Sequence, residues 1–106
     1  MYLKMTMKLD RLRSLDYYIL RSIALKRKAT LREIQDDVKG ELHKEPKPRE
    51  VSYKYVWERV QKLIDVGLIE PVVEKPLVLK IKPKYYEHII KFIFAYVDLI
   101  HKLNDD

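Results

Sequence analysis

A helix spanning about residues 52–66, followed at once by strand-like sequence, constrains the fold more than any other feature of this chain. Ser52 is a favourable N-cap, and Gly67 suits the left-handed position that ends many helices. Apolar residues recur every three or four positions between these ends and predict one buried face, made of Tyr53, Val56, Trp57, Val60, Leu63 and Ile64. The opposite face is rich in charge and is expected to be exposed.

The sequence after Gly67 predicts a short β-hairpin. Two aliphatic and β-branched runs, 68–73 and 77–81, are separated by the turn segment 74–76. Pro71 lies in the first run and cannot donate a hydrogen bond to a neighbouring strand. The first run is therefore expected to be an edge strand or a bulged strand.

Three further helices complete the predicted architecture. The first begins near Ser14, and the second begins after Thr30, which forms a capping-box pattern with Glu33. Two prolines make residues 43–51 a loop, because proline lacks a backbone donor and restricts the residue before it. The last helix spans about residues 84–103.

The last helix has more apolar surface than one side of a small domain needs. Its main apolar line follows the spacing of a coiled coil, which predicts a homodimer. The residues expected at the dimer interface are Ile89, Ile93, Tyr96, Val97, Ile100 and Leu103. Charged residues interrupt the apolar run, which is shorter than the roughly 20 residues needed to cross a bilayer, so no membrane partner is predicted.

Length and composition indicate a single basic domain with a hydrophobic core. The chain has 106 residues, 47% of them hydrophobic, and a formal net charge of +6. The positive excess indicates an anionic partner, although a soluble protein that is simply basic has the same composition. The chain contains no cysteine, which excludes disulfides and cysteine-ligated metal sites and is typical of a cytoplasmic protein.

The predicted order of helix, helix, helix, hairpin and helix resembles a winged helix-turn-helix domain. "LDYYILRSI" is similar to the first helix of such domains, "TLREIQDDV" to the second, and "VSYKYVWERVQKLIDVGLIEP" to the third with its characteristic ending. The chain most resembles archaeal and bacterial transcriptional regulators of the PadR-like and MarR-like kind. The loop 43–51 is longer than the turn of about three or four residues in a strict helix-turn-helix, which favours the PadR-like branch.

The resemblance implies a mainly α fold with a small β-hairpin wing. Residues 14–84 would form the winged helix-turn-helix domain, and residues 85–106 would form a C-terminal dimerisation helix. Residues 1–13 would be an N-terminal arm or an extension of the first helix.

The resemblance also implies contacts to double-stranded DNA, with the third helix in the major groove and the wing against the backbone or the minor groove. The base-edge candidates are Ser52, Lys54, Tyr55, Glu58, Arg59 and Lys62. The phosphate or wing candidates are Arg32, Lys44, Lys47, Arg49, Lys75, Lys80 and Lys82. The alternative for the helix is a solvated face with ordinary pairs such as Glu58–Lys62. The alternative for the wing lysines is a charged edge that prevents strand pairing, and both roles can hold at once.

The leading hypothesis is sequence-specific DNA binding by a homodimeric transcriptional regulator. The alternatives are a protein-interaction winged-helix subunit and a nucleoid-type protein that coats DNA. No enzymatic activity, cofactor or metal is predicted, because His43, His88 and His101 lack metal-ligand spacing. The sequence also contains neither a glycine-rich phosphate loop nor a nucleophile motif.

Overall fold

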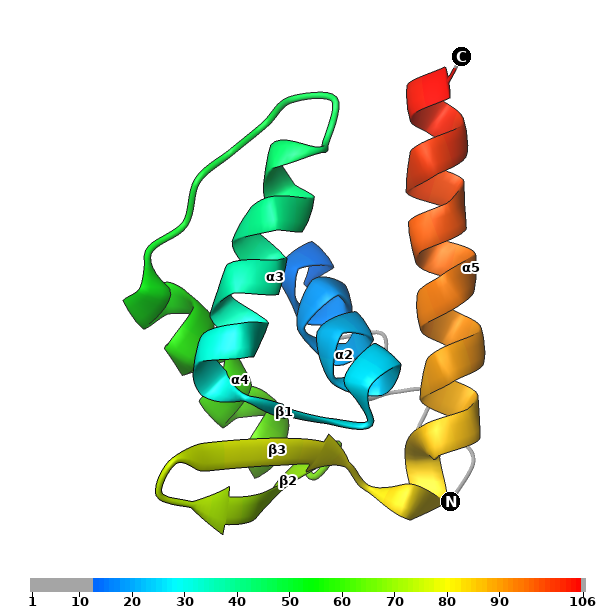
Figure 1. Cartoon of the computed structure of the whole chain (residues 1–106). Coiled ribbons are helices and arrows are strands. Elements are labelled where there is room, and N and C mark those ends of the chain that lie inside the picture. The colour runs from blue at the N-terminus through cyan, green and yellow to red at the C-terminus, as the bar shows by residue number, and fades with distance from the viewer. Residues whose placement is uncertain (1–12, 106) are drawn as a thin grey trace.

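A computed structural model of the chain describes residues 13–105, and these are mainly helical with a small three-stranded antiparallel sheet (Figure 1). The elements are α2 (Ser14–Lys26), β1 (Lys28–Thr30), α3 (Leu31–His43), α4 (Tyr53–Asp65), β2 (Ile69–Glu74), β3 (Leu77–Ile81), the 3-10 helix η1 (Pro83–Tyr85) and α5 (Tyr86–Asp105). The arm or helix extension predicted for the N-terminus falls on residues 1–12, which lie outside the described residues, and α2 begins directly after Arg13.

The sheet has the order β1-β3-β2, and both pairings are antiparallel. The predicted hairpin is present as β2 and β3, and β2 is both an edge strand and irregular between Pro71 and Val73, as the proline indicated. Strand β1 was not predicted. It has only three residues and pairs with β3, with Lys28 opposite Lys80, so its partner lies far away in the sequence.

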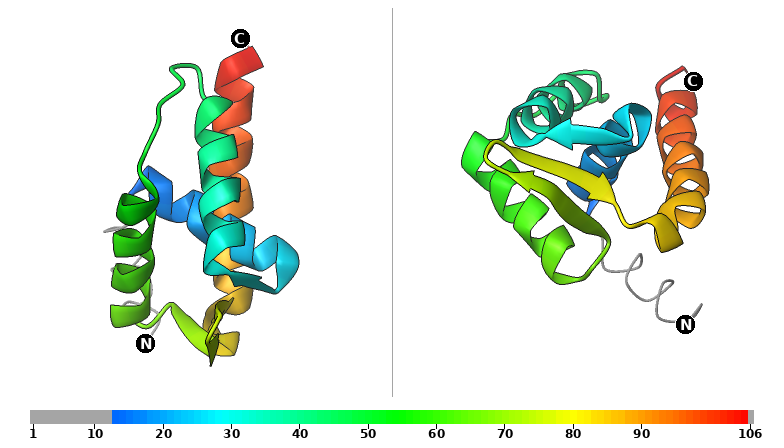
Figure 2. Two further views of the ribbon diagram at one scale, coloured as in Figure 1. Left: turned by 60° about the vertical axis from the view of Figure 1, so that its left-hand side comes forward. Right: turned by 60° about the horizontal axis from the view of Figure 1, so that its bottom comes forward.

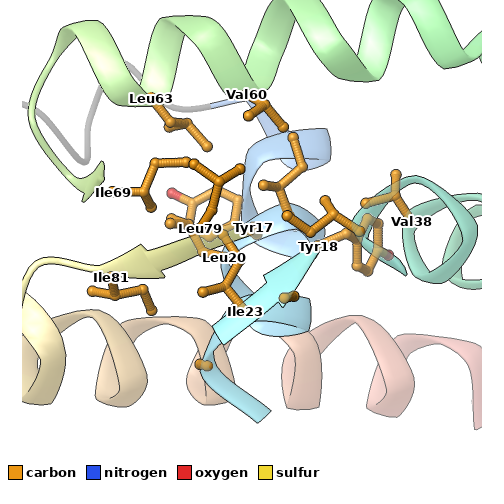
Figure 3. Packing of buried hydrophobic residues seen from close by; sticks show 14 of the residues in the cluster. Tyr17, Tyr18, Leu20, Ile23, Val38, Val60, Leu63, Ile69, Leu79 and Ile81 are labelled. Carbon is orange, nitrogen blue, oxygen red and sulfur yellow. The ribbon is translucent and has the colours of Figure 1, made fainter. Parts of the chain in front are cut away.

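The core lies between the inner face of the sheet and the helices, with α2 at its centre (Figure 3). Leu20 and Ile23 of α2 are fully buried. Figure 3 shows Leu79 of the sheet, Leu20 of α2 and Val60 of α4 gathered in one cluster. Helix α4 packs one side into this cluster next to β2, and its own far side points away from the core.

The ends of α3 and α4 have the predicted caps. The Thr30 side chain accepts a hydrogen bond of 3.1 Å from the Glu33 backbone N–H, and the Glu33 carboxylate accepts one of 3.0 Å from the Thr30 backbone. The Ser52 hydroxyl accepts from the Tyr55 backbone N–H at 3.0 Å. Gly67 follows α4 with a φ of 84°, a conformation that glycine adopts without the steric cost of a side chain.

Polar side chains join α2 to α3 beside the core. The Asp37 carboxylate accepts a 2.7 Å hydrogen bond from the Ser22 hydroxyl and lies 2.8 Å from the Lys26 ammonium. Partial burial acts to raise the pKa of Asp37, but the hydrogen bonds from Lys26 and Ser22 outweigh it and lower the pKa below its ordinary value. The negative form of Asp37 therefore favours the folded state.

The first half of α5 packs against α2 and belongs to the same core. Ile89 and Ile93 are buried by the chain itself, and Tyr96 stacks on Tyr17 with ring centroids 4.0 Å apart. The sequence assigned Ile89 and Ile93 to a dimer interface, and this is corrected, because neither side chain is accessible to a second copy. Side chains of the other predicted interface residues, Val97, Ile100 and Leu103, lie outside what the structure describes.

The second half of α5 extends past the end of α2 in Figure 1 and in the left view of Figure 2. Three large apolar side chains of α5 are exposed, namely Phe92, Phe94 and Leu99. Across residues 13–105, none of the helices has both the length and the apolar character needed to span a bilayer.

Candidate nucleic-acid interface

Helix α4 is buried on one side and exposed on the other. Val56, Val60 and Leu63 are fully buried, which turns the opposite side of the helix toward solvent. We call that side the α4 face, and its charged members are Lys54, Glu58, Lys62 and Asp65. Tyr53 and Trp57 were expected in the core. Instead, Tyr53 is exposed and Trp57 is only half-buried.

The charged side chains of the α4 face are available to a ligand. Within residues 13–105, the side chains of Lys54, Glu58 and Lys62 have no hydrogen-bond or ion-pair partner. The Glu58–Lys62 pair of the solvated-face alternative is therefore not formed. Two lysines and two carboxylates leave the α4 face without net charge, so it offers donors and acceptors in equal measure rather than a positive field.

Arg59 does not belong to this exposed set. Its guanidinium donates to both carboxylate oxygens of Asp16, with Nε–Oδ1 at 2.9 Å and Nη2–Oδ2 at 2.6 Å. The Asp16 side chain is fully buried and that of Arg59 is 14% exposed. Hydrogen bonding and attraction from Asp16 raise the pKa of Arg59, outweighing the effect of burial. The prediction of base contact by Arg59 is corrected, since the side chain instead holds α4 against the start of α2.

Tyr55 lies at the margin between the core and the α4 face. Its side chain is half-buried against the core, while its hydroxyl is at the surface and accepts a 3.0 Å hydrogen bond from the Arg13 guanidinium. The ring is thus removed from the exposed face, contrary to its predicted role as a groove-facing residue. The Tyr55 hydroxyl proton is the part that can still be donated to a ligand.

Tyr53 joins the first turn of α4 to α3, a role that helical spacing did not predict. The Arg32 guanidinium lies 4.4 Å from the Tyr53 ring centroid and the Lys39 ammonium lies 4.6 Å from it. The Tyr53 hydroxyl donates to Asp36 at 3.1 Å, and its backbone carbonyl accepts from Gln35 at 3.0 Å. Arg32 is thereby held beside the start of α4, with a side chain that is 69% exposed.

The loop between α3 and α4 contributes less than the sequence predicted. Lys44 lies 3.6 Å from Glu41, and Arg49 lies 2.9 Å from Glu45, so both positive charges are locally compensated. Lys47 is exposed. In Figure 1 the apex of this loop and the β-hairpin lie at opposite ends of the molecule, so these basic residues are separate from the hairpin lysines.

The three hairpin lysines have two different positions. Lys75 is exposed at the turn between β2 and β3, whereas Lys80 and Lys82 lie on the outer face of the sheet. Lys80 is 3.5 Å from Glu70 of the neighbouring strand. In Figure 1 and in the right view of Figure 2, the hairpin turn and the start of α4 lie on the same side of the molecule. The structure thus places Lys75, but not Lys80 or Lys82, on the side where α4 begins.

Comparison with family models, curated protein sequences and solved structures gave no match to this chain. Its function must therefore be inferred from its own surface. Among residues 13–105, histidine and carboxylate side chains do not gather into a group of three that could hold a metal ion. Within residues 13–105, the exposed side of α4 presents lysine and carboxylate side chains that have no partner in the fold.

Proposed function

We propose that this chain is a winged helix-turn-helix protein that binds double-stranded DNA as a homodimeric transcriptional regulator. The observation that carries the proposal is the position of α4. This helix buries one side on the core and exposes the other, on the same side of the molecule as the turn of a β-hairpin whose strands belong to the sheet order β1-β3-β2. A helix exposed in this way can enter the major groove, which is wide enough to admit one.

The α4 face has the chemistry required to distinguish base pairs. Lys54 and Lys62 can donate to the O6 and N7 atoms of guanine, and Glu58 can accept from the N4 amino group of cytosine. Because the face has no net charge, it would discriminate between sequences more than it would raise overall affinity. Arg32 and Lys75 would add contacts to phosphates on either side of it.

The exposed apolar side chains of α5 support a second copy of the chain as the dimer partner. Phe92 and Phe94 are 39% and 40% exposed, and Leu99 is 57% exposed. Phe92 and Leu99 lie seven positions apart on one side of α5, whereas Phe94 lies on the other side. A two-fold pair joined along the side of Phe92 and Leu99 would bury these two side chains and present two α4 faces to half-sites about one helical turn of DNA apart, roughly 34 Å. The same surface favours the second candidate function, in which a different protein binds α5.

Selection of duplexes from a random pool, followed by fluorescence anisotropy, tests the proposal. The wild-type chain is expected to enrich a sequence with two related half-sites. The variant Lys54→Ala/Lys62→Ala is expected to lose about 1–3 kcal/mol of binding free energy for each base contact removed on the selected site, and much less on random duplex.

The matched control is Lys44→Ala/Lys47→Ala, which removes the same charge from the distant loop and is expected to bind the selected site nearly as the wild type does. Absence of binding to any duplex at about 50 mM salt would refute DNA binding. Equal losses on selected and random duplex would favour the nucleoid-type alternative.

A further inference from the structure

A row of charged side chains crosses the outer face of the sheet. The register places Lys28 of β1 opposite Lys80 of β3, and Lys80 opposite Glu70 of β2. Lys82 follows two positions after Lys80 and so continues on the same face. The inner face of the same strands is apolar and buried, so these lysines lie on the opposite side of the sheet from α4.

The pairing of Lys28 with Lys80 works against folding. Like charges directly opposite each other on neighbouring strands repel. Glu70 lies 3.5 Å from Lys80, and its negative charge offsets only part of this repulsion. Within the described residues, the side chains of Lys28 and Lys82 have no acidic partner at all. Stabilising contacts within the described residues therefore do not account for Lys28 and Lys82.

Arg27 occupies a backbone conformation that an arginine adopts only at a cost. It follows the last residue of α2 with a φ of 67°, in the region that favours glycine. Its side chain is exposed and, within residues 13–105, has no hydrogen-bond or ion-pair partner. A strained residue with an unpaired charge is a reason to look for a function at that position.

The strained Arg27 lies beside the lysine row. It is adjacent to Lys28 in the sequence and lines an open groove of about 430 Å³ together with Lys84, next to the end of β3. Glu87 is the one acidic residue in the lining of this groove. We define the basic sheet face as Lys28, Lys80 and Lys82 on the outer face of the sheet, together with Arg27 and Lys84 in the groove at the end of β3.

We propose that the basic sheet face binds the sugar-phosphate backbone of a nucleic-acid duplex, as a second surface that is separate from α4. Neighbouring strands are about 4.8 Å apart, and alternate residues of one strand are about 6.7 Å apart, so the lysines form a regular array of charge. A duplex carries closely and evenly spaced phosphates along its length, and backbone contacts of this kind supply affinity without sequence preference.

This inference goes beyond the proposed function, because it does not require α4 to read bases. The two surfaces have complementary properties. The α4 face has no net charge and can discriminate, whereas the basic sheet face has five basic side chains against the carboxylates of Glu70 on the sheet and Glu87 in the groove, and can attract a duplex of any sequence. Because they lie on opposite sides of the sheet, a straight duplex bound to one would leave the other open to a second duplex or to a bent continuation of the first.

The test measures binding of the full chain to a random-sequence duplex over a range of salt concentrations. The variant Lys28→Ser/Lys80→Ser/Lys82→Ser is expected to bind more weakly, and the slope of log K against log salt is expected to become shallower by about 2.7 for three lost phosphate contacts. The control Lys44→Ser/Lys47→Ser is expected to stay close to the wild type in both affinity and slope. An unchanged slope in the triple variant, or an equal change in the control, would overturn the proposal.

A second variant separates binding from folding. Arg27→Gly removes the charge and relieves the positive φ, so its melting temperature is expected to rise by a few degrees while its affinity for random duplex falls several-fold. Higher stability with unchanged affinity would count against a binding role for Arg27. Binding of the wild type to vesicles with anionic lipid, lost in the triple variant while duplex binding persists, would assign the face to a membrane surface instead and overturn the inference.

The same assay keeps the two proposals distinguishable. If Lys54→Ser/Lys62→Ser abolishes all duplex binding while the triple variant behaves as the wild type, the basic sheet face is refuted and the α4 proposal stands. Suppose instead that the triple variant loses duplex binding, that Lys54→Ser/Lys62→Ser retains it, and that the wild type shows no sequence preference. The α4 proposal is then refuted and the basic sheet face stands. A wild type that binds no duplex refutes both.

Discussion

The buried ion pair between Asp16 and Arg59 makes a sharp prediction about how α4 is held in place. Replacing Asp16 by asparagine keeps the size of the side chain and removes its charge, which leaves the Arg59 guanidinium in a largely buried position without a counter-ion. The two residues are 43 positions apart in the sequence, so their contact contributes only once α2 and α4 have packed together. Asp16→Asn is therefore expected to destabilise the fold rather than a single helix.

The expected magnitude follows from the geometry. Breaking a buried pair by removing one partner costs about 3–5 kcal/mol. The lower end applies here, about 3 kcal/mol, because the Arg59 side chain is still 14% exposed and keeps some access to water. A domain of this size changes its melting temperature by about 4–8 °C for each kcal/mol, which predicts a decrease of about 12–24 °C.

Urea unfolding followed by circular dichroism measures the effect. Arg59→Met is expected to destabilise by a similar amount, and the double variant Asp16→Asn/Arg59→Met by about 1–3 kcal/mol less than the sum of the two single variants. The control is Glu70→Gln, which breaks a solvent-exposed pair and is expected to cost no more than about 1 kcal/mol. If Asp16→Asn unfolds at the same urea concentration as Glu70→Gln, the structural role assigned to the pair is wrong.

Three further changes test other parts of the structure. Thr30→Ala removes the N-cap of α3 and is expected to cost about 1 kcal/mol in urea unfolding. The pKa of Asp37 is held below its ordinary value of 3.8, because hydrogen bonds from Lys26 and Ser22 outweigh partial burial. The contribution of Asp37 to the free energy of unfolding is therefore complete above about pH 4 and is lost as the pH falls through the lowered pKa. Ser22→Ala removes one of the two hydrogen bonds, so this variant is expected to lose less stability than the wild type in acid unfolding curves. Leu99→Glu places a charge on the exposed apolar side of α5 that also carries Phe92, and it is expected to give monomers in light scattering while leaving the circular dichroism spectrum unchanged. A wild type that is itself monomeric would contradict dimerisation through α5.

Sequence reasoning located most elements because their signals are local. The Thr30 and Ser52 caps each bond to a backbone group three residues away, and the change of hydrophobic period after Gly67 separates α4 from the hairpin. The irregularity of β2 follows from Pro71 alone. Such features depend on backbone geometry within a few residues, so a linear pattern is sufficient to predict them.

The candidate site was predicted less completely, because the helical period shows which side of α4 is apolar but not how far the core extends around it. Tyr53 shares the spacing of the buried residues, yet it lies at the first turn, beyond the edge of the core, and contacts α3 instead. Arg59 lies near the margin of the exposed side, and only the packing of α2 brings a buried carboxylate to it.

The sequence by itself determined the helices, the hairpin and the amphipathic character of α4, since periodicity and capping act over a few residues. Only the tertiary structure decided which charged residues are paired inside the fold and which are exposed. The pairing of Asp16 with Arg59, the burial of Ile89 by α2 and the alignment of Lys28 with Lys80 each join residues that are distant in the sequence. Contacts of that kind depend on how the elements pack in three dimensions, which no local pattern contains.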